Sequence, residues 1–209
     1  MKNNLLPIAK EGFVYIFYAI LAYFIFSFLD LDLFEFISFL SIIALLFIYR
    51  NPERELSAFE QNSVLSPVDG VVLSIKESGG EYTYKVEIDS GYRDVSILRV
   101  PMTSLLKKID LKRGARLSRY SSLAKKINEN VELVFENKNL NKIKLLHMLK
   151  QSFTSIELGT RESQQLSQGS RYGVMISGIT TIYLPQNFRL NVGVGSEVKA
   201  SESLIGYFS

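Results

Sequence analysis

The sequence predicts a mostly β protein, an antiparallel barrel or sandwich of half-barrel hairpins, preceded by a transmembrane helical hairpin. Two observations carry this prediction: apolar residues are concentrated before residue 50, and short β-branched segments separated by turns follow. A length of 209 residues allows one main domain and an accessory segment. With 47% hydrophobic and 22% charged residues, a disordered chain and a polytopic membrane protein are both excluded.

Two apolar runs fill the first part of the chain, Gly12 to Leu29 and Phe36 to Tyr49. As a helix the first would extend about 27 Å, close to the thickness of a hydrocarbon core, whereas the second is short for a full span. Both runs are apolar on every face, which disfavours a buried hairpin of a soluble protein. No small-residue cleavage site follows the first run, which disfavours a signal peptide. We expect residues 1–49 to form a membrane anchor.

The charges around these runs predict the orientation of the anchor. Basic residues flank the pair of runs and acidic residues occupy the connection between them. The basic residues are Lys2, Lys10, Arg50 and Arg54, and the acidic ones are Asp30, Asp32 and Glu35. The positive-inside rule places both ends in the cytoplasm. We therefore expect an inner (cytoplasmic) membrane protein whose domain of residues 50–209 faces the cytoplasm.

Residues 50–209 have the composition of a β domain. Short segments rich in β-branched and aromatic residues are separated by Gly, Asn, Asp and Ser, which is typical of strands and turns. These segments are 71–77, 82–89, 95–100, 131–137, 142–149, 153–159, 172–185 and 188–194. Only residues 105–127 are expected to hold a helix or a long loop, and Gly114 argues against a regular helix there.

A basic stretch extends from Arg99 to Lys126, with Asp110 as its one acidic residue. Its lipid-surface candidates are Lys107, Lys108, Lys112 and Arg113. Each basic residue near an anionic leaflet contributes about 1 kcal/mol of attraction, so this stretch predicts a lipid-binding surface. A solvated charged face is the alternative interpretation.

Other classes of site are disfavoured by composition. The chain has no Cys and one His, so it has no thiolate chemistry and a zinc enzyme of the His-rich kind is not expected. We predict no metal site. The net charge of +3 does not indicate a nucleic-acid partner.

Two fragments share a design in which Gly turns punctuate short Val and Ile strands: SPVDGVVLSI at 66–75 and VGVGSEVKASESLIGYF at 192–208. Lipoyl and biotinyl domains, in which two half-barrels of hairpins embrace each other, have the same rhythm. Those domains carry a Lys at an exposed hairpin tip, and these fragments offer no such Lys. The pattern therefore predicts a lipoyl-like fold and not a carrier function.

Read in order with their neighbours, these fragments resemble the short bacterial and archaeal phosphatidylserine decarboxylases. The matching fragments are IYRNPERE at 48–55, VLSPVDGVV at 64–72, VSILRVP at 95–101, KKINENVELVFE at 125–136, GSRYGVMISGITTIYLP at 169–185 and VGVGSEVKASESLIGYF at 192–208. The resemblance implies a chain that cleaves itself before the serine of a Gly-Ser pair. That serine becomes a pyruvoyl group, which acts as an electron sink in converting phosphatidylserine to phosphatidylethanolamine. The resemblance also implies self-association.

The family's signature is broken in this chain. Its Asp is present as Asp69, which would orient a base or, alternatively, is a turn residue before Gly70. The position of its catalytic His is matched by Leu105 or a neighbour, which accepts no proton. Where the family has Gly-Ser, this chain has Ser177 followed by Gly178. The β-branched Ile176 before Ser177 resists the strained backbone that cleavage needs.

The one imidazole belongs to His147. Alternation places it on the same face as its neighbours Leu145 and Leu149, so we expect a buried or half-buried strand histidine. Replacement of the missing base by His147 is the alternative.

Three functions follow from this reading. The first is a degenerate, membrane-anchored homologue without a cofactor that binds an anionic aminophospholipid, a lipid-synthesis enzyme or a second copy of itself. The second is an active decarboxylase, a pyruvoyl-dependent carboxy-lyase, with its pyruvoyl group derived from Ser177. The third is a membrane-tethered half-barrel adaptor, and the sequence does not separate it from the first.

Overall fold

The computed structural model describes residues 6–54, 62–77 and 79–209. The chain divides into two compact units, one ending at Glu53 and the other spanning Arg54–Ser209. Each unit is described by itself.

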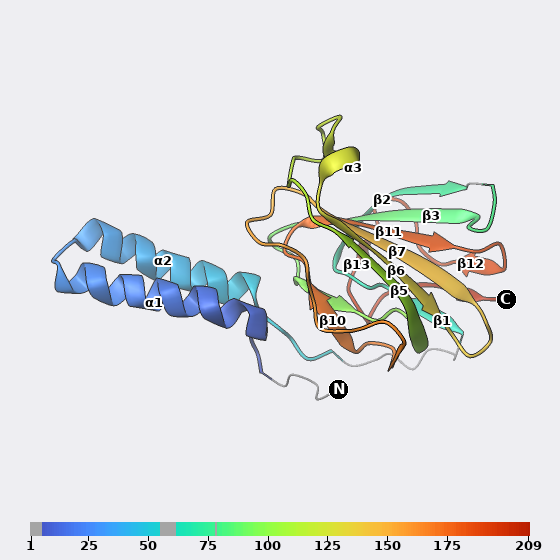
Figure 1. The fold of residues 1–209 in the computed structure, drawn as a ribbon, viewed down its shortest axis with the longest axis horizontal. Coiled ribbons are helices and arrows are strands. Elements are labelled where there is room, and N and C mark those ends of the chain that lie inside the picture. Colours follow the sequence, from blue (N-terminus) through green and yellow to red (C-terminus); the bar gives the residue numbers. More distant parts are fainter. Residues whose placement is uncertain (1–5, 55–61, 78) are drawn as a thin grey trace. The chain divides into compact units, whose positions relative to one another are not determined.

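The first unit is a pair of helices, drawn in blue in Figure 1. A short 3-10 turn, Lys10–Gly12, leads into α1 (Phe13–Phe28), and α2 (Asp32–Ile48) follows. Phe26 and Phe34 pack with ring centroids 5.3 Å apart where the chain turns between the helices. At the open end, the backbone N–H of Ala9 donates to the carbonyl of Tyr49 at 2.8 Å.

The surface of this helical pair is apolar. Ile16 is the one buried residue of α1, and Ser38 is the one buried residue of α2. Large apolar side chains are exposed along both helices, although a soluble hairpin would be expected to bury them on one face. Among the described residues, Lys10–Phe28 is the one helix long and apolar enough to cross a membrane. The helix α2 has 17 residues and extends about 26 Å, which is short for a membrane span.

Within the described residues, the second unit consists of strands and one short helix. The strands are β1 (Ser63–Leu65), β2 (Gly70–Glu77), β3 (Tyr84–Ser90), β4 (Ile97–Arg99), β5 (Ser104–Lys112), β6 (Asn130–Glu136), β7 (Lys142–Leu149), β8 (Glu157–Leu158), β9 (Gln164–Leu166), β10 (Arg171–Val174), β11 (Gly178–Leu184), β12 (Phe188–Leu190), β13 (Glu197–Val198) and β14 (Leu204–Phe208). The helix is α3 (Ala124–Ile127).

These strands form three antiparallel sheets. The largest has eight strands in the order β13-β2-β3-β11-β7-β6-β5-β9, and the two small sheets have the orders β1-β14-β12 and β4-β10-β8. Figure 1 shows the large sheet as a twisted layer that runs through the unit. The predicted antiparallel β class is confirmed, but the described strands do not close into a barrel.

The core is built by strict alternation on β6 and β7. Every second residue of each strand is buried, and the buried residues of the two strands lie side by side on the same face of the sheet. Leu133 lies opposite Leu145, and Phe135 lies opposite Ile143. His147 occupies one of these inward positions, opposite Val131.

The helix or long loop expected over residues 105–127 is wrong for its first third, because Ser104–Lys112 is the strand β5. A bulge between Leu106 and Lys108 breaks the register with β6 and leaves both Lys107 and Lys108 exposed. An extra residue of this kind removes the period of two that identifies a strand in the sequence. The rest of the segment is a loop that contains α3.

Candidate functional site

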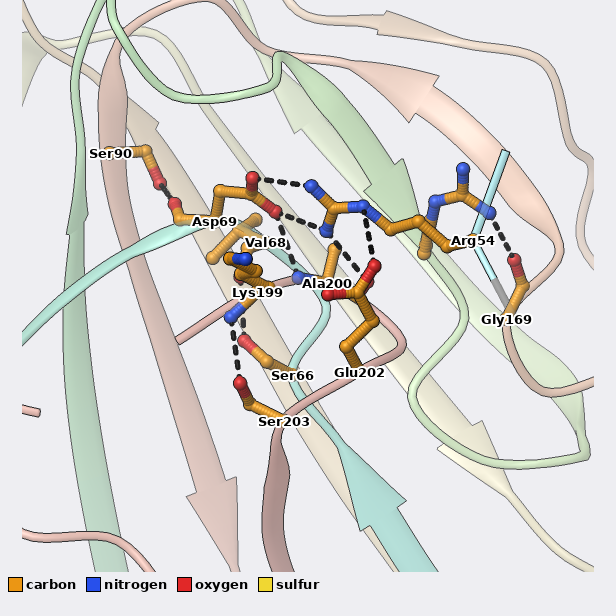
Figure 2. A network of polar contacts seen from close by, with 11 residues as sticks. Arg54, Ser66, Val68, Asp69, Ser90, Gly169, Lys199, Ala200, Glu202 and Ser203 are labelled. Carbon is orange, nitrogen blue, oxygen red and sulfur yellow. Dashed lines mark hydrogen bonds and ion pairs between the residues drawn. The ribbon is translucent and has the colours of Figure 1, made fainter. Parts of the chain in front are cut away.

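Asp69 lies in the buried segment just before β2, and an arginine holds its carboxylate. Nη1 of Arg54 donates to Oδ1 of Asp69 and Nη2 donates to Oδ2, each at 2.6 Å. The backbone N–H of Ala200 also donates to Oδ1, at 2.8 Å. The side chains of Arg54 and Asp69 are only 6% and 11% exposed, so this is a bidentate ion pair largely shielded from water (Figure 2).

The surrounding contacts tie Asp69 to two other parts of the chain. Arg54 also donates to the carbonyl of Ala200 at 2.8 Å and lies 3.5 Å from a carboxylate oxygen of Glu202. On the other side, Oγ of Ser90 donates to the carbonyl of Asp69 at 2.5 Å. Figure 2 shows these contacts converging on one cluster. The cluster joins the start of β2 to the end of β3 and to the segment before β14.

The Ser177–Gly178 pair lies at the same end of the sheet as Asp69. Gly178 begins β11 and is the cross-strand neighbour of Ser90, whose hydroxyl contacts Asp69. Ser177 and Ile176 are both buried, and the carbonyl of Ser177 accepts a hydrogen bond from the backbone N–H of Lys150 at 3.1 Å. The structure therefore brings the two predicted catalytic residues into one neighbourhood.

The reversed order of this pair is built into the packing. A Cβ atom at Gly178 would lie 2.5 Å from Sδ of Met175 and 2.7 Å from the backbone oxygen of Met148. Real Cβ atoms do not approach this closely, and the Met148 oxygen belongs to a sheet backbone that yields little. A serine at position 178, after a glycine at 177, would require its neighbours to move.

The residue that the resemblance matches to the family's histidine lies in a strand. Leu105 lies on β5, where it pairs with Glu136 of β6 and Gln165 of β9. An alkyl side chain at this position accepts no proton. The cross-strand neighbour of Leu105, Glu136, is a carboxylate that pairs with Lys107.

The only imidazole is buried elsewhere in the sheet. Nδ1 of His147 lies 2.8 Å from Oγ1 of Thr180, and Nε2 lies 2.6 Å from the hydroxyl of Tyr172. Burial lowers the pKa of His147 to about 3 and raises the pKa of Tyr172 well above its ordinary value. The imidazole is therefore neutral and has partners on both nitrogens. The predicted buried strand histidine is confirmed.

Each basic side chain of the lipid-surface candidates has an acidic neighbour. Lys107 pairs with Glu136 at 2.9 Å. Lys108 lies 3.6 Å from Glu132, Lys112 lies 3.6 Å from Asp110, and Arg113 pairs with the buried Glu129. The four basic side chains remain 46–68% exposed. Their role at a lipid surface stays a prediction.

Arg54, Thr180 and Tyr172 are the residues that the sequence did not single out as partners. The sequence marks Arg54 only as a charge flanking the apolar runs, because nothing local in the sequence relates it to a residue fifteen positions later. Thr180 is the cross-strand neighbour of His147 on β11, whereas Tyr172 reaches His147 from β10, a strand of a different sheet. No group of three or more His, Cys, Asp or Glu placed to hold a metal ion occurs among the described residues.

Comparison with known proteins gives a consistent result. The phosphatidylserine decarboxylase family matches residues 43–206. A protein of Geobacter metallireducens named phosphatidylserine decarboxylase proenzyme is 29% identical over 99% of both chains. Proteins of the same name from Geotalea uraniireducens and Desulfotalea psychrophila are 29% and 26% identical, again over 99% of both chains. These matches relate the β domain to proteins named for a phospholipid-metabolising enzyme, and the chain belongs to the phosphatidylserine decarboxylase family.

Proposed function

We propose that this chain is a membrane-anchored member of the phosphatidylserine decarboxylase family that binds lipid or a partner and does not self-process. The observation that carries the proposal is the lack of space for a side chain at Gly178. The family is pyruvoyl-dependent, and the resemblance implies that its pyruvoyl group comes from the serine of a Gly-Ser pair. Here the packing favours the reverse order.

The groups that would assist cleavage support the same proposal. A general base typically accelerates a proton-transfer step about 10²- to 10⁴-fold. The charge of the Asp69 carboxylate is compensated by its ion pair with Arg54, which gives Asp69 a structural role. His147 is neutral, buried and bonded to Thr180 and Tyr172. Neither group is left to activate Ser177, so we propose that no pyruvoyl cofactor forms.

The helical pair supports a membrane anchor. Its exposed apolar surface is costly in water and favourable in hydrocarbon. We propose that residues 1–49 are this anchor and that residues 50–209 form the cytoplasmic domain at the inner membrane. Lys10 and Arg50 flank the helices as the positive-inside rule requires, whereas Lys2 lies outside the described residues.

The arrangement of the two glycine-punctuated fragments supports the lipoyl-like half-barrel design. The first contains most of β2, and the second contains β13 and β14. Residues Glu197 and Val198 of β13 pair with Val71 and Gly70 of β2. This short pairing at the edge of the large sheet supports a design in which the two fragments pack together.

The proposed ligand is an anionic aminophospholipid, bound with help from Lys107, Lys108, Lys112 and Arg113. The test is calorimetric titration of the full-length protein in detergent with dihexanoyl phosphatidylserine, and with dihexanoyl phosphatidylcholine as the control lipid. We expect tighter binding of the serine lipid. Changing all four basic residues to Gln should weaken this binding, whereas the control variant Lys76→Gln/Lys138→Gln should not.

Two results of the same experiment would contradict the proposal. Release of phosphatidylethanolamine during the titration would show an active decarboxylase that uses atypical groups. Equal affinity for both lipids would remove the headgroup-binding role. Co-purification with an integral membrane protein, together with equal lipid affinity, would favour the adaptor function.

A further inference from the structure

Exposed apolar side chains gather around α3. Tyr120 is 83% exposed, Leu123 is 51% exposed and Ile127 is 46% exposed. Large side chains of this kind are normally buried when they occur together, and their exposure in one short segment indicates a contact surface.

Two neighbouring loops add aromatic rings at the same end of the unit. Tyr92 follows β3, Phe153 follows β7, and their rings stack 6.2 Å apart with both side chains exposed. The loop that leads into α3 is hydrogen-bonded to them, since Nη1 of Arg116 donates to the carbonyl of Phe153 at 2.9 Å. The hydroxyl of Tyr92 donates to the carbonyl of Gln151, whose own N–H donates to the carbonyl of Arg116. Figure 1 shows α3 at the end of the large sheet.

This segment is held in place by an asparagine. The side chain of Asn128 accepts from the N–H of Leu117 at 2.9 Å and donates to the carbonyls of Leu117 and Leu149 at 2.9 and 2.8 Å. The N–H of Ala115 donates to the carbonyl of Ile127, which closes the loop at its base. A pinned loop loses less conformational entropy when its apolar residues contact a partner.

The charge of the segment identifies the kind of partner. No acidic residue lies between Asp110 and Glu129, and this interval contains five basic residues after Lys112. Arg113 and Arg116 pair with the buried Glu129, and Arg119 pairs with Asp89. Lys125 and Lys126 are exposed, and within the described part of the chain neither has an acidic partner within 4.0 Å.

We propose that the α3 surface docks the β unit on an anionic phospholipid bilayer. We define the α3 surface as Tyr92, Tyr120, Leu123, Ile127 and Phe153. Aromatic and aliphatic tips with lysines beside them match the boundary between headgroups and acyl chains, where apolar burial and attraction to anionic lipid act together. Lys125 and Lys126 supply the charge complementarity.

The inference rests on the proposed anchor, because an anchored helical pair would hold the adjoining β unit at the bilayer. Arg54 begins that unit directly after the unit that ends at Glu53. Because the two units are consecutive in one chain, an anchored helical pair would keep the local concentration of lipid near the β unit high, so that even a weak surface contact is populated.

The absence of Cys allows a test at single sites in the full-length protein. Leu123→Cys is labelled with an environment-sensitive nitrobenzoxadiazole dye and reconstituted into vesicles of phosphatidylcholine, with or without phosphatidylglycerol. Leu140→Cys is the matched control, because Leu140 is 75% exposed in the turn at the opposite end of β6. We expect a blue shift and protection from aqueous iodide at position 123 in phosphatidylglycerol vesicles, and neither effect at position 140.

A charge variant tests the lysines. Lys125→Gln/Lys126→Gln in the labelled protein should reduce the shift in phosphatidylglycerol vesicles, whereas Lys76→Gln/Lys138→Gln should leave it unchanged. Both pairs consist of exposed lysines, so they differ in position and not in chemistry.

Flotation of the same vesicles distinguishes failure of the docking surface from failure of the membrane anchor. Protein that floats with the vesicles but shows the same emission at positions 123 and 140 would overturn the docking surface and leave the anchor intact. Protein that fails to float contradicts both. A shift at position 123 that occurs in native membranes but not in phosphatidylglycerol vesicles would assign the surface to a protein partner and overturn the proposal.

Discussion

Arg54, the first residue of the β unit, donates hydrogen bonds to both carboxylate oxygens of Asp69, each at 2.6 Å. The same guanidinium donates to the carbonyl of Ala200, so it joins the start of the β unit to the segment before its last strand. Asp69 is an acid whose charge is already compensated. Its contacts are those of a residue that holds the fold together.

Replacing Arg54 with Gln should therefore destabilise the protein strongly. The variant leaves Asp69 as a buried carboxylate without its partner, a change that typically costs about 3–5 kcal/mol. The double variant Arg54→Gln/Asp69→Asn removes the stranded charge and should recover part of the loss. The measurement is urea unfolding of the full-length protein in detergent. Equal stability of Arg54→Gln and the unaltered chain would show that the ion pair is not structural.

Restoring the family's order at the processing position should be harmful and should not restore processing. Ser177→Gly/Gly178→Ser places a Cβ where Met175 and Met148 leave no room, and overpacking of this kind costs about 1–3 kcal/mol. The single variant Ser177→Gly is the control, since it removes the hydroxyl without adding the clash. Urea unfolding measures the change in stability, and gel electrophoresis shows whether the chain is cleaved. A double variant that is as stable as its control, or that splits into two fragments, would contradict this view of Gly178.

The stability of the β unit should fall as pH decreases through the range below 6.5, in part because of His147. Burial lowers its folded-state pKa from 6.5 to about 3, so the unfolded chain binds the proton more readily. Stability from this group is complete above pH 6.5 and is lost toward pH 3. At pH 5 the loss is about 2 kcal/mol.

The variant His147→Gln isolates this effect, because His147 is the only histidine. Carboxylates titrate in both proteins, so the difference between the two pH profiles belongs to the imidazole. The measurement is the free energy of unfolding from urea titrations between pH 8 and pH 5. Parallel profiles for the two proteins would mean that His147 is not a neutral buried group.

The β class was predictable because the information is local. Residues 131–137 and 142–149 are rich in β-branched and other apolar residues, and they correspond to the strands β6 and β7, with His147 on the inward face as expected. The strand β5 is not recognisable in the sequence, because its bulge exposes two successive lysines. The pattern of charges there resembled a loop, and only pairing with β6 and β9 reveals the strand.

The candidate site was predictable in its residues and not in its contacts. Asp69 and Ser177 were identified by resemblance, and the structure links their neighbourhoods through Ser90. The partner of Asp69 was not predictable, because the approach of Arg54 depends on the path of the chain in space. The lack of space for a side chain at Gly178 likewise arises from Met175 and from Met148 on a different strand.

Intact-mass analysis of the purified full-length protein tests the central claim most directly. Without self-processing, the protein is a single chain of 23.7 kDa that keeps the peptide bond between Ile176 and Ser177. Two fragments, residues 1–176 and a blocked fragment of residues 177–209, would show that a pyruvoyl group forms. That result would contradict the account and identify the protein as a processed decarboxylase.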